Sequence, residues 1–225
     1  MAIELNELSL AVTDIFDSLL LISKNFIKFA LIMKFEEIKE ILKTKTVGIA
    51  GWGGLGSNCA ISLARVGIGK LVIADFDIVT KANLNRQYYF TNQIGQIKSF
   101  ALKDNINAVN PDCKVINHKI KLDSKNIPEI YKDCNVIVEA FDLAEMKKMI
   151  LETVLAFMPD KYLVSGLGMA GWGESNTIKT TNYDKLTICG DFMSEVSDDN
   201  PPLAPRVCIV SNMQANRVLE IFLKK

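Results

Sequence analysis

One short stretch decides the fold of this chain: Gly51-Trp52-Gly53-Gly54-Leu55-Gly56-Ser57. The apolar run Thr46–Ala50 comes before it, and this run predicts a buried strand. Residues 58–66 come after it, and their pattern predicts a helix that ends at Gly67. A glycine loop between a strand and a helix is the context in which G-x-G-x-x-G indicates a nucleotide site.

The glycines of this loop meet three requirements of a phosphate-binding turn. Gly51 permits the tight turn, Gly53 lets a phosphate approach the backbone, and Gly56 lets the helix pack closely on the strand. The helix N-terminus offers unpaired N–H groups and about half a positive charge to an anion. Together with Gly54 and Leu55, these residues are predicted to bind a nucleotide. The alternative is a glycine-rich turn that binds no ligand.

An acidic residue follows the next predicted strand. That strand is Lys70–Ala74, and Asp75 stands at its end. A ribose-binding acid belongs about 20 residues beyond the glycine loop, which is where Asp75 lies. The pair of features indicates a nucleotide site more strongly than the loop alone.

Two cations, Arg86 and Lys98, follow the glycine loop and Asp75 in the sequence. A dehydrogenase holds one pyrophosphate and has no need of further cations directed at phosphates. An enzyme that cleaves ATP must neutralise a triphosphate and the charge that develops at the reacting phosphorus. Arg86 as a planar fork and Lys98 as a point charge suit that task. The alternative is that both are solvated surface cations.

These motifs resemble those of the ThiF/MoeB family, the prokaryotic relatives of ubiquitin-activating enzymes. The resemblance runs from about Lys45 to the C-terminus, and the chain is most similar to the short ThiF-type enzymes of thiamine biosynthesis. It rests on the glycine loop and on Asp75-Phe76-Asp77, Asn83-Leu84-Asn85-Arg86-Gln87 and Lys98.

The resemblance implies an enzyme that uses ATP and Mg²⁺ to adenylate the C-terminal glycine carboxylate of a ubiquitin-like sulfur carrier protein. It implies that Asp75 anchors the ribose and that Asn83 and Arg86 contact the phosphates. Asp77 and Lys98 complete the predicted nucleotide-binding set. Arg86 and Lys98 are also predicted to act in catalysis.

Asp142 follows the predicted strand 135–140. The carboxyl ends of parallel strands share one rim, so Asp142 is expected on the same rim as Asp75 and the glycine loop. The resemblance implies that Asp142 assists Mg–ATP, which makes it a predicted catalytic and metal-binding residue. The alternative is an N-cap for the next helix.

The proposed reaction needs no catalytic base. A C-terminal carboxylate has an unperturbed pKa of about 3.3–3.7, so it is ionised at neutral pH. The barrier is one of charge and alignment. The single histidine, His118, supports neither a Ser–His–Asp nor a Cys–His arrangement.

The five cysteines are widely spaced, and no C-x-x-C pair occurs. A structural zinc site is therefore not predicted, and reduced thiols in a cytoplasm are the simple interpretation because no secretory signal is evident. Some relatives form an acyl-disulfide or thioester, and Cys189 in the predicted crossover is the candidate for such a link. A packing or merely solvent-facing cysteine is the alternative.

The N-terminal segment 1–32 lies outside the resemblance. Residues 15–33 are strongly apolar, but Asp17, Lys24 and Lys28 interrupt them. The segment is predicted to be an amphipathic helix packed on the domain or on a dimer partner, or a membrane-surface helix. The third alternative is that translation begins at Met33 and that the upstream codons are read in error. Some relatives contribute an N-terminal arginine to the partner subunit's triphosphate, whereas the first arginine here is Arg65.

Strands alternating with helices predict an α/β fold, a Rossmann-like and mostly parallel sheet with helices on both faces. A less regular C-terminal part with antiparallel strands completes one domain over residues 33–225. Further helices are expected at Phe35–Leu42, 96–109, 126–132, 143–157 and 207–223, and further strands at 113–117, Tyr162–Gly166 and 176–180, with no clear period over 182–205.

A formal net charge of zero favours neither nucleic acid nor an anionic membrane as a partner. The resemblance implies a carrier ending in Gly-Gly and a homodimer. Three alternatives stay open: an NAD-dependent oxidoreductase, a non-catalytic carrier-binding homologue, and an enzyme for a molybdopterin-type carrier.

Overall fold

The computed structural model describes residues 33–224. Helix α2 spans Phe35–Leu42, and Glu37 is the last residue of a first unit, Met1–Glu37. Residues Ile38–Lys225 form a second compact unit, which contains the whole sheet. The predictions made for residues 1–32 lie outside the described residues.

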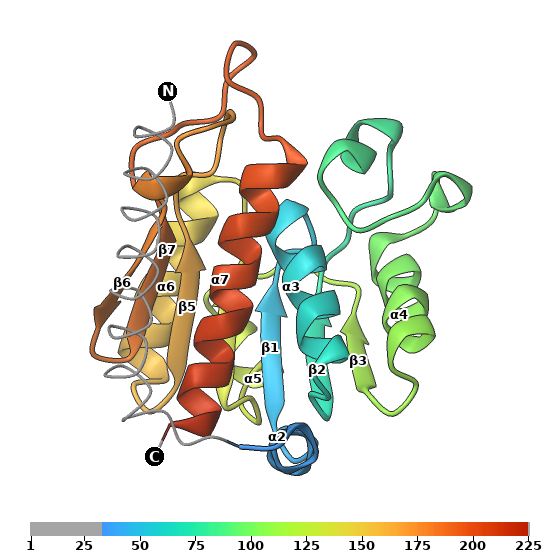
Figure 1. Ribbon diagram of the computed structural model, residues 1–225, viewed down its shortest axis with the longest axis vertical. Coiled ribbons are helices and arrows are strands. Elements are labelled where there is room, and N and C mark those ends of the chain that lie inside the picture. Colours follow the sequence, from blue (N-terminus) through green and yellow to red (C-terminus); the bar gives the residue numbers. More distant parts are fainter. Residues whose placement is uncertain (1–32, 225) are drawn as a thin grey trace, which may run out of the picture. The chain divides into compact units, whose positions relative to one another are not determined.

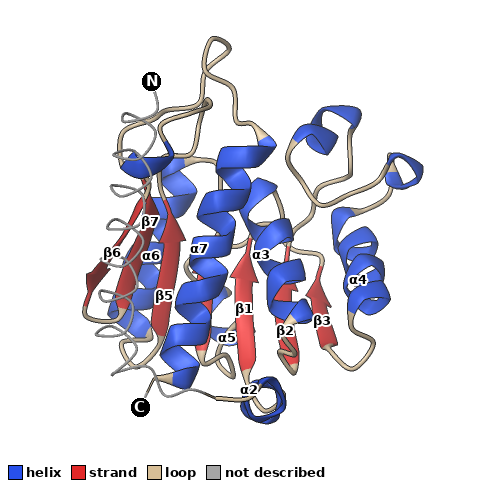
Figure 2. Cartoon of the chain, viewed as in Figure 1, coloured by secondary structure: helices blue, strands red, loops and turns tan. Residues whose placement is uncertain are grey.

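The described part of the second unit contains a seven-stranded sheet in the order β3-β2-β1-β4-β5-β7-β6 (Figure 2). All neighbouring strands are parallel except β6 and β7, which pair antiparallel. The strands are β1 (Thr46–Ala50), β2 (Lys70–Ala74), β3 (Lys114–His118), β4 (Val136–Glu139), β5 (Tyr162–Gly166), β6 (Lys179–Tyr183) and β7 (Leu186–Gly190).

Helices cover both faces of this sheet. In Figure 1, α3, α4 and α7 lie in front of the sheet, and α5 and α6 lie behind it. Short 3₁₀ turns occupy Lys81–Asn85, Thr91–Gln93 and Ser175–Thr177. The helices of this unit, besides the end of α2, are α3 (Gly54–Arg65), α4 (Lys98–Val109), α5 (Ile127–Ile130), α6 (Ala144–Phe157) and α7 (Ala204–Leu223).

Successive residues of the central strands point to two separate apolar clusters. Val47 and Ile49 belong to the cluster that includes residues of α3 and α7. Ala50 and Ile137 belong to the cluster that includes residues of α5 and α6. Every residue of β1 is therefore buried, as expected for a parallel strand covered on both faces.

The predicted fold class is confirmed. Strands β1, β2 and β5 have the predicted ends, and α3 begins at Gly54 because the end of the glycine loop forms its first turn. The strand predicted at 176–180 lies at Lys179–Tyr183, after the turn Ser175–Thr177. Strand β7 was not predicted, since residues 182–205 show no clear period. No helix among residues 33–224 is long and apolar enough to cross a membrane.

The strand order reverses direction between β1 and β4. Connections from β1 and β4 leave on opposite sides at such a point, which opens a crevice beyond the carboxyl ends of the strands. The glycine loop follows β1, and Asp142 follows β4. The fold thus places both at its topological switch point.

Candidate nucleotide-binding site

The glycine loop has a backbone that larger residues would disturb. Gly51 has φ +91°, in the left-handed region that favours glycine. A Cβ on Gly56 would lie 1.9 Å from the carbonyl oxygen of Gly51, so the turn and the helix touch backbone to backbone. These two glycines meet the predicted requirements for a tight turn and close packing.

The loop ends at the N-terminus of α3, where the N–H groups are free of side-chain caps. Gly53 is the N-cap residue, no side chain caps the helix, and its first turn holds no acidic residue. A Cβ on Gly53 would meet nothing closer than Gln87 Nε2, at 3.7 Å. The first turn can therefore donate N–H groups to an anion.

Asp75 lies against this loop. Its carboxylate accepts hydrogen bonds from the N–H of Trp52 at 2.9 Å and from the N–H of Asp77 at 2.8 Å. Burial raises the pKa of the Asp75 carboxyl above its usual value, while the Asp77 N–H and the charge of Lys98 act in the opposite direction. The end of β2 is thereby fastened to the glycine loop.

Arg86 reaches the same place from the 3₁₀ turn Lys81–Asn85. Its Cγ lies 3.4 Å from the position of a Cβ on Gly54. Asn58 Nδ2 donates to the carbonyl oxygens of Gly54 and Arg86, at 2.7 and 2.8 Å, which holds this segment on α3. The guanidinium donates to Asn85 Oδ1 at 2.8 Å, within its own turn.

The side chain of Asn83 serves the same turn. Asn83 Oδ1 accepts a hydrogen bond from the N–H of Thr80 at 3.0 Å. The structure thus gives Asn83 a local folding role, and its contact with a phosphate stays a prediction.

Lys98 is a buried cation beside two carboxylates. It is the first residue of α4 and is 5 % exposed, and its Nζ lies 3.1 Å from the carboxylate of Asp77. Its charge also acts on Asp75. Lys98, Asp75 and Asp77 therefore form one charged group at the ends of β2 and α4, and the alternative of a solvated surface lysine is wrong.

Asp142 lies in the connection between β4 and α6, and its side chain is exposed. Within residues 33–224 it makes no hydrogen bond or ion pair, and the N-cap of α6 is Leu143. The alternative of Asp142 as an N-cap is therefore not observed. The same connection touches the glycine loop, because a Cβ on Gly51 would lie 2.9 Å from the oxygen of Ala140.

The described residues contain no group of three or more His, Cys, Asp or Glu side chains that could hold a metal by themselves. Mg²⁺ in nucleotide sites is held by one or two carboxylates together with substrate phosphates. A single exposed carboxylate at Asp142, in the connection that touches the glycine loop, fits that manner of binding.

Cys189 is not in an irregular crossover, and that predicted placement is wrong. It lies on strand β7 with 0 % of its surface exposed, and Thr180 Oγ1 is 3.7 Å from its sulfur. Burial raises the pKa of the thiol. A nucleophilic cysteine needs an accessible thiolate, so this environment opposes the covalent role. All five cysteines lie in the described residues and are free.

The sequence analysis did not single out Glu139 and Lys147. Glu139 ends β4 and is fully buried, and Lys147 on α6 forms an ion pair with it at 3.0 Å. The available signal was a carboxylate in an otherwise apolar strand, followed by a lysine in the first turn of the next helix. A buried charge of this kind requires a partner.

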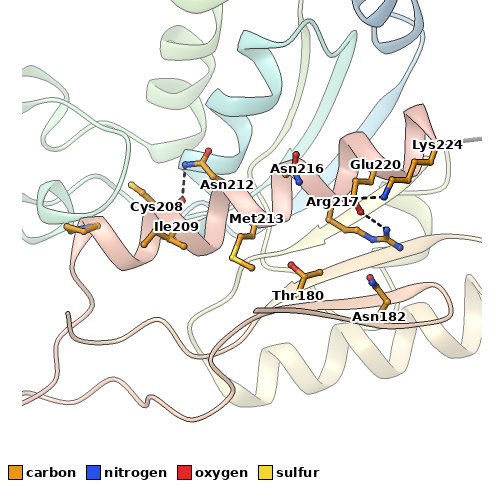
Figure 3. A pocket seen from close by; sticks show the side chains of 11 residues that line it. Thr180, Asn182, Cys208, Ile209, Asn212, Met213, Asn216, Arg217, Glu220 and Lys224 are labelled. Atoms are coloured by element: carbon orange, nitrogen blue, oxygen red, sulfur yellow. Dashed lines mark hydrogen bonds and ion pairs between the residues drawn. The ribbon is translucent and has the colours of Figure 1, made fainter. Parts of the chain in front are cut away.

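A pocket of about 840 Å³ lies elsewhere, between the outer side of α7 and strand β6 (Figure 3). Thr180 and Asn182 line it from β6, and Met213 and Arg217 line it from α7. None of the predicted site residues borders it. The candidate nucleotide site instead consists of the backbone N–H groups at the start of α3 and the charged side chains near them.

Comparison with known proteins identifies the family of this chain. The model of the ThiF family matches residues 24–225. The chain belongs to the ThiF family. The match begins before Lys45, so it includes residues 24–32, which the resemblance described above did not cover.

Curated relatives of this ThiF-family chain carry names of activating enzymes. A "Probable molybdopterin-synthase adenylyltransferase" of Porphyra purpurea is 31% identical over 197 residues, 83% of this chain and 50% of the relative. "Ubiquitin-like modifier-activating enzyme 5" of Caenorhabditis elegans is 40% identical over 95 residues, 42% of this chain and 22% of the relative. The chain thus spans about half or less of the length of these relatives.

Among solved structures, E. coli tRNA N6-threonylcarbamoyladenosine dehydratase in complex with AMP has a TM-score of 0.75 and 19% sequence identity. The likeness covers 83% of this chain and 89% of that one. E. coli MccB with AMPCPP and MccA has a TM-score of 0.65 at 18% identity, covering 83% of this chain and 58% of that one. At such identities these likenesses support the fold.

Proposed function

We propose that this chain is an ATP-dependent adenylyltransferase that activates the C-terminal glycine carboxylate of a ubiquitin-like sulfur carrier protein. The products are a carrier acyl-adenylate and pyrophosphate. The observation that carries the proposal is the convergence of uncapped α3 N–H groups, Arg86 beside Gly54, and buried Lys98 beside Asp75 and Asp77, all at one rim.

The chemistry follows from charge and alignment. The attacking carboxylate is ionised without help, and the leaving pyrophosphate carries the charge that must be stabilised. The N–H groups of α3 bind phosphate oxygens, Arg86 and Lys98 stabilise the developing charge, and Asp75 binds the ribose. Mg²⁺ held by Asp142 and the phosphates would supply further positive charge at the triphosphate.

The carrier we propose is of the ThiS type, which would place the enzyme in thiazole formation during thiamine biosynthesis. A molybdopterin-type carrier is the second candidate, and the name of the Porphyra relative favours it. An NAD-dependent oxidoreductase would need only the glycine loop and Asp75. The two cations at the rim and family membership weigh against that alternative.

Exchange of labelled pyrophosphate into ATP tests this proposal. The protein is mixed with Mg-ATP, labelled pyrophosphate and either a ThiS-type or a molybdopterin-type carrier ending in Gly-Gly. We expect exchange with one of the two carriers and none with a carrier that lacks the terminal glycines. Exchange with neither carrier, together with tight NAD binding in calorimetry, would overturn the proposal.

The variant Arg86→Ala identifies the site. Loss of one positioned charge from the transition state costs about 100-fold or more in rate, so exchange should fall by at least that factor while the fold persists. Arg65→Ala, an exposed arginine at the other end of α3, is the matched control and should keep the parent rate. Carrier binding with unmeasurable exchange in the parent would instead support a non-catalytic homologue.

The domain organisation and the oligomeric state complete the proposal. We propose that residues 33–225 act as one domain and that the enzyme is a homodimer, which light scattering of the purified chain would test.

A further inference from the structure

A buried polar cluster lies behind the connection that carries Asp142. Its centre is the Glu139 carboxylate, which is fully buried at the carboxyl end of β4. It accepts hydrogen bonds from Lys147 Nζ at 3.0 and 3.1 Å, from the N–H of Phe141 at 2.7 Å and from the hydroxyl of Ser165. Gln214 Nε2 donates to the carbonyl oxygen of Glu139 at 2.9 Å.

Lys147 is fully used inside this cluster. An ammonium group has three N–H donors, and those of Lys147 bond to both oxygens of Glu139 and to the carbonyl oxygen of Gly166 at 2.7 Å. None is left for a phosphate. Lys147 therefore joins the end of β4 to the end of β5.

The Phe141 N–H links this cluster to the site. Phe141 immediately precedes Asp142, and its N–H is held by the buried Glu139 carboxylate. On the other side, a Cβ on Gly51 would lie 2.9 Å from the oxygen of Ala140 and 3.2 Å from Phe141 Cδ1. The connection is thus fixed between the ion pair and the first glycine of the loop.

We propose that the Lys147–Glu139 pair positions the connection between β4 and α6, and so sets the place of Asp142 beside the glycine loop for Mg-ATP. Lys147 and Glu139 are positioning residues and touch no substrate. This inference rests on the proposed function. A displacement of about 1 Å at a reacting site can cost up to about 100-fold in rate, so loss of this support should be measurable.

The decisive variant is the double substitution Glu139→Met with Lys147→Met. It removes both charges together, because removal of one would leave the other buried without a partner. We expect the Mg²⁺ concentration that gives half-maximal pyrophosphate exchange to rise about tenfold. By calorimetry, affinity for ATP in EDTA should stay near that of the parent, while the gain in affinity on adding Mg²⁺ should shrink.

A conservative variant separates positioning from packing. Glu139→Gln with Lys147→Met is also uncharged, but its side-chain oxygen can still accept the Phe141 N–H, so it should recover most of the parent's Mg²⁺ response. Lys148→Met with Glu152→Met is the matched control, since this exposed pair lies on the same helix with 3.8 Å between Nζ and Oε1. The control should behave as the parent.

Each result has a definite reading. A folded Met/Met variant with the parent's Mg²⁺ response overturns the inference and leaves the proposed function standing. A parent that neither binds ATP nor exchanges pyrophosphate overturns both. Should the Met/Met variant not fold, Glu139→Leu with Lys147→Met takes its place, because it also removes the acceptor of the Phe141 N–H. An unchanged Mg²⁺ response there would equally overturn the inference.

Discussion

The substitution Gly53→Ala tests whether this glycine is needed for phosphate binding or for folding. Gly53 has φ −72°, which lies outside the left-handed region that favours glycine, and its added methyl group would lie 3.7 Å from the nearest atom, Gln87 Nε2. The free protein therefore has room for the methyl group. A phosphate seated on the N–H groups of α3 needs that same space.

The expected magnitudes follow from these contacts. Alanine is a poorer N-cap than glycine but restricts the unfolded chain, so the free energy of unfolding should change by no more than about 1 kcal/mol. Each hydrogen bond from an N–H to a charged phosphate contributes about 1.5–3 kcal/mol. Displacing the phosphate from two of them costs at least about 3 kcal/mol, which weakens the Kd for ATP by more than about 100-fold.

Calorimetric titration with Mg-ATP and urea denaturation give the two quantities. Gly56→Ala is the comparator, because its methyl group would lie 1.9 Å from the oxygen of Gly51 and should cost about 3 kcal/mol of stability as well as ATP binding. Gly53→Ala should lose binding alone. A Gly53→Ala protein that binds ATP as the parent does would refute the phosphate site and leave the loop as a feature of the fold.

Two further predictions concern Asp75 and Cys189. Burial raises the pKa of the Asp75 carboxyl in the folded protein, so ionised Asp75 lowers stability as pH rises from the unfolded pKa of about 3.9 through the raised value. The unfolding free energy of Asp75→Asn, measured by urea denaturation, should therefore increase relative to that of the parent between pH 4 and pH 7. The opposite trend would contradict the assignment. Cys189→Ala should exchange pyrophosphate at the parent rate and lose about 1 kcal/mol of stability, because the thiol packs in the core. A covalent carrier adduct on Cys189, detected by mass spectrometry after incubation with Mg-ATP and carrier, would restore the covalent role.

Much of the fold was predictable because its signals are local. The runs that form β1, β2 and β5 are short, apolar and bounded by turn residues, and their predicted ends agree with the structure. Strand β7 was not predicted because polar and apolar residues alternate only weakly over Leu186–Gly190, which lies within a polar stretch. Its pairing with β5 and β6 supplies the strand with partners that no local pattern reveals.

The candidate site divides in the same way. The glycine loop and Asp75 are recognised from spacing along the chain, and their contact at 2.9 Å through the Trp52 N–H agrees with that spacing. Whether Lys98 faced solvent or Asp77 could not be read from its place near the start of a helix. Burial of Lys98 depends on how α4 packs and on where the segment after β2 places Asp77.

By itself, the sequence determined that a glycine loop joins a buried strand to a helix, with an acid at the end of the next strand. These are properties of neighbouring residues and of backbone geometry. Only the tertiary structure decided that Cys189 is buried and that Glu139 and Lys147 meet beside Gly166. The reason is that burial and charge pairing depend on which strands and helices lie side by side, and distant segments of the chain supply those partners.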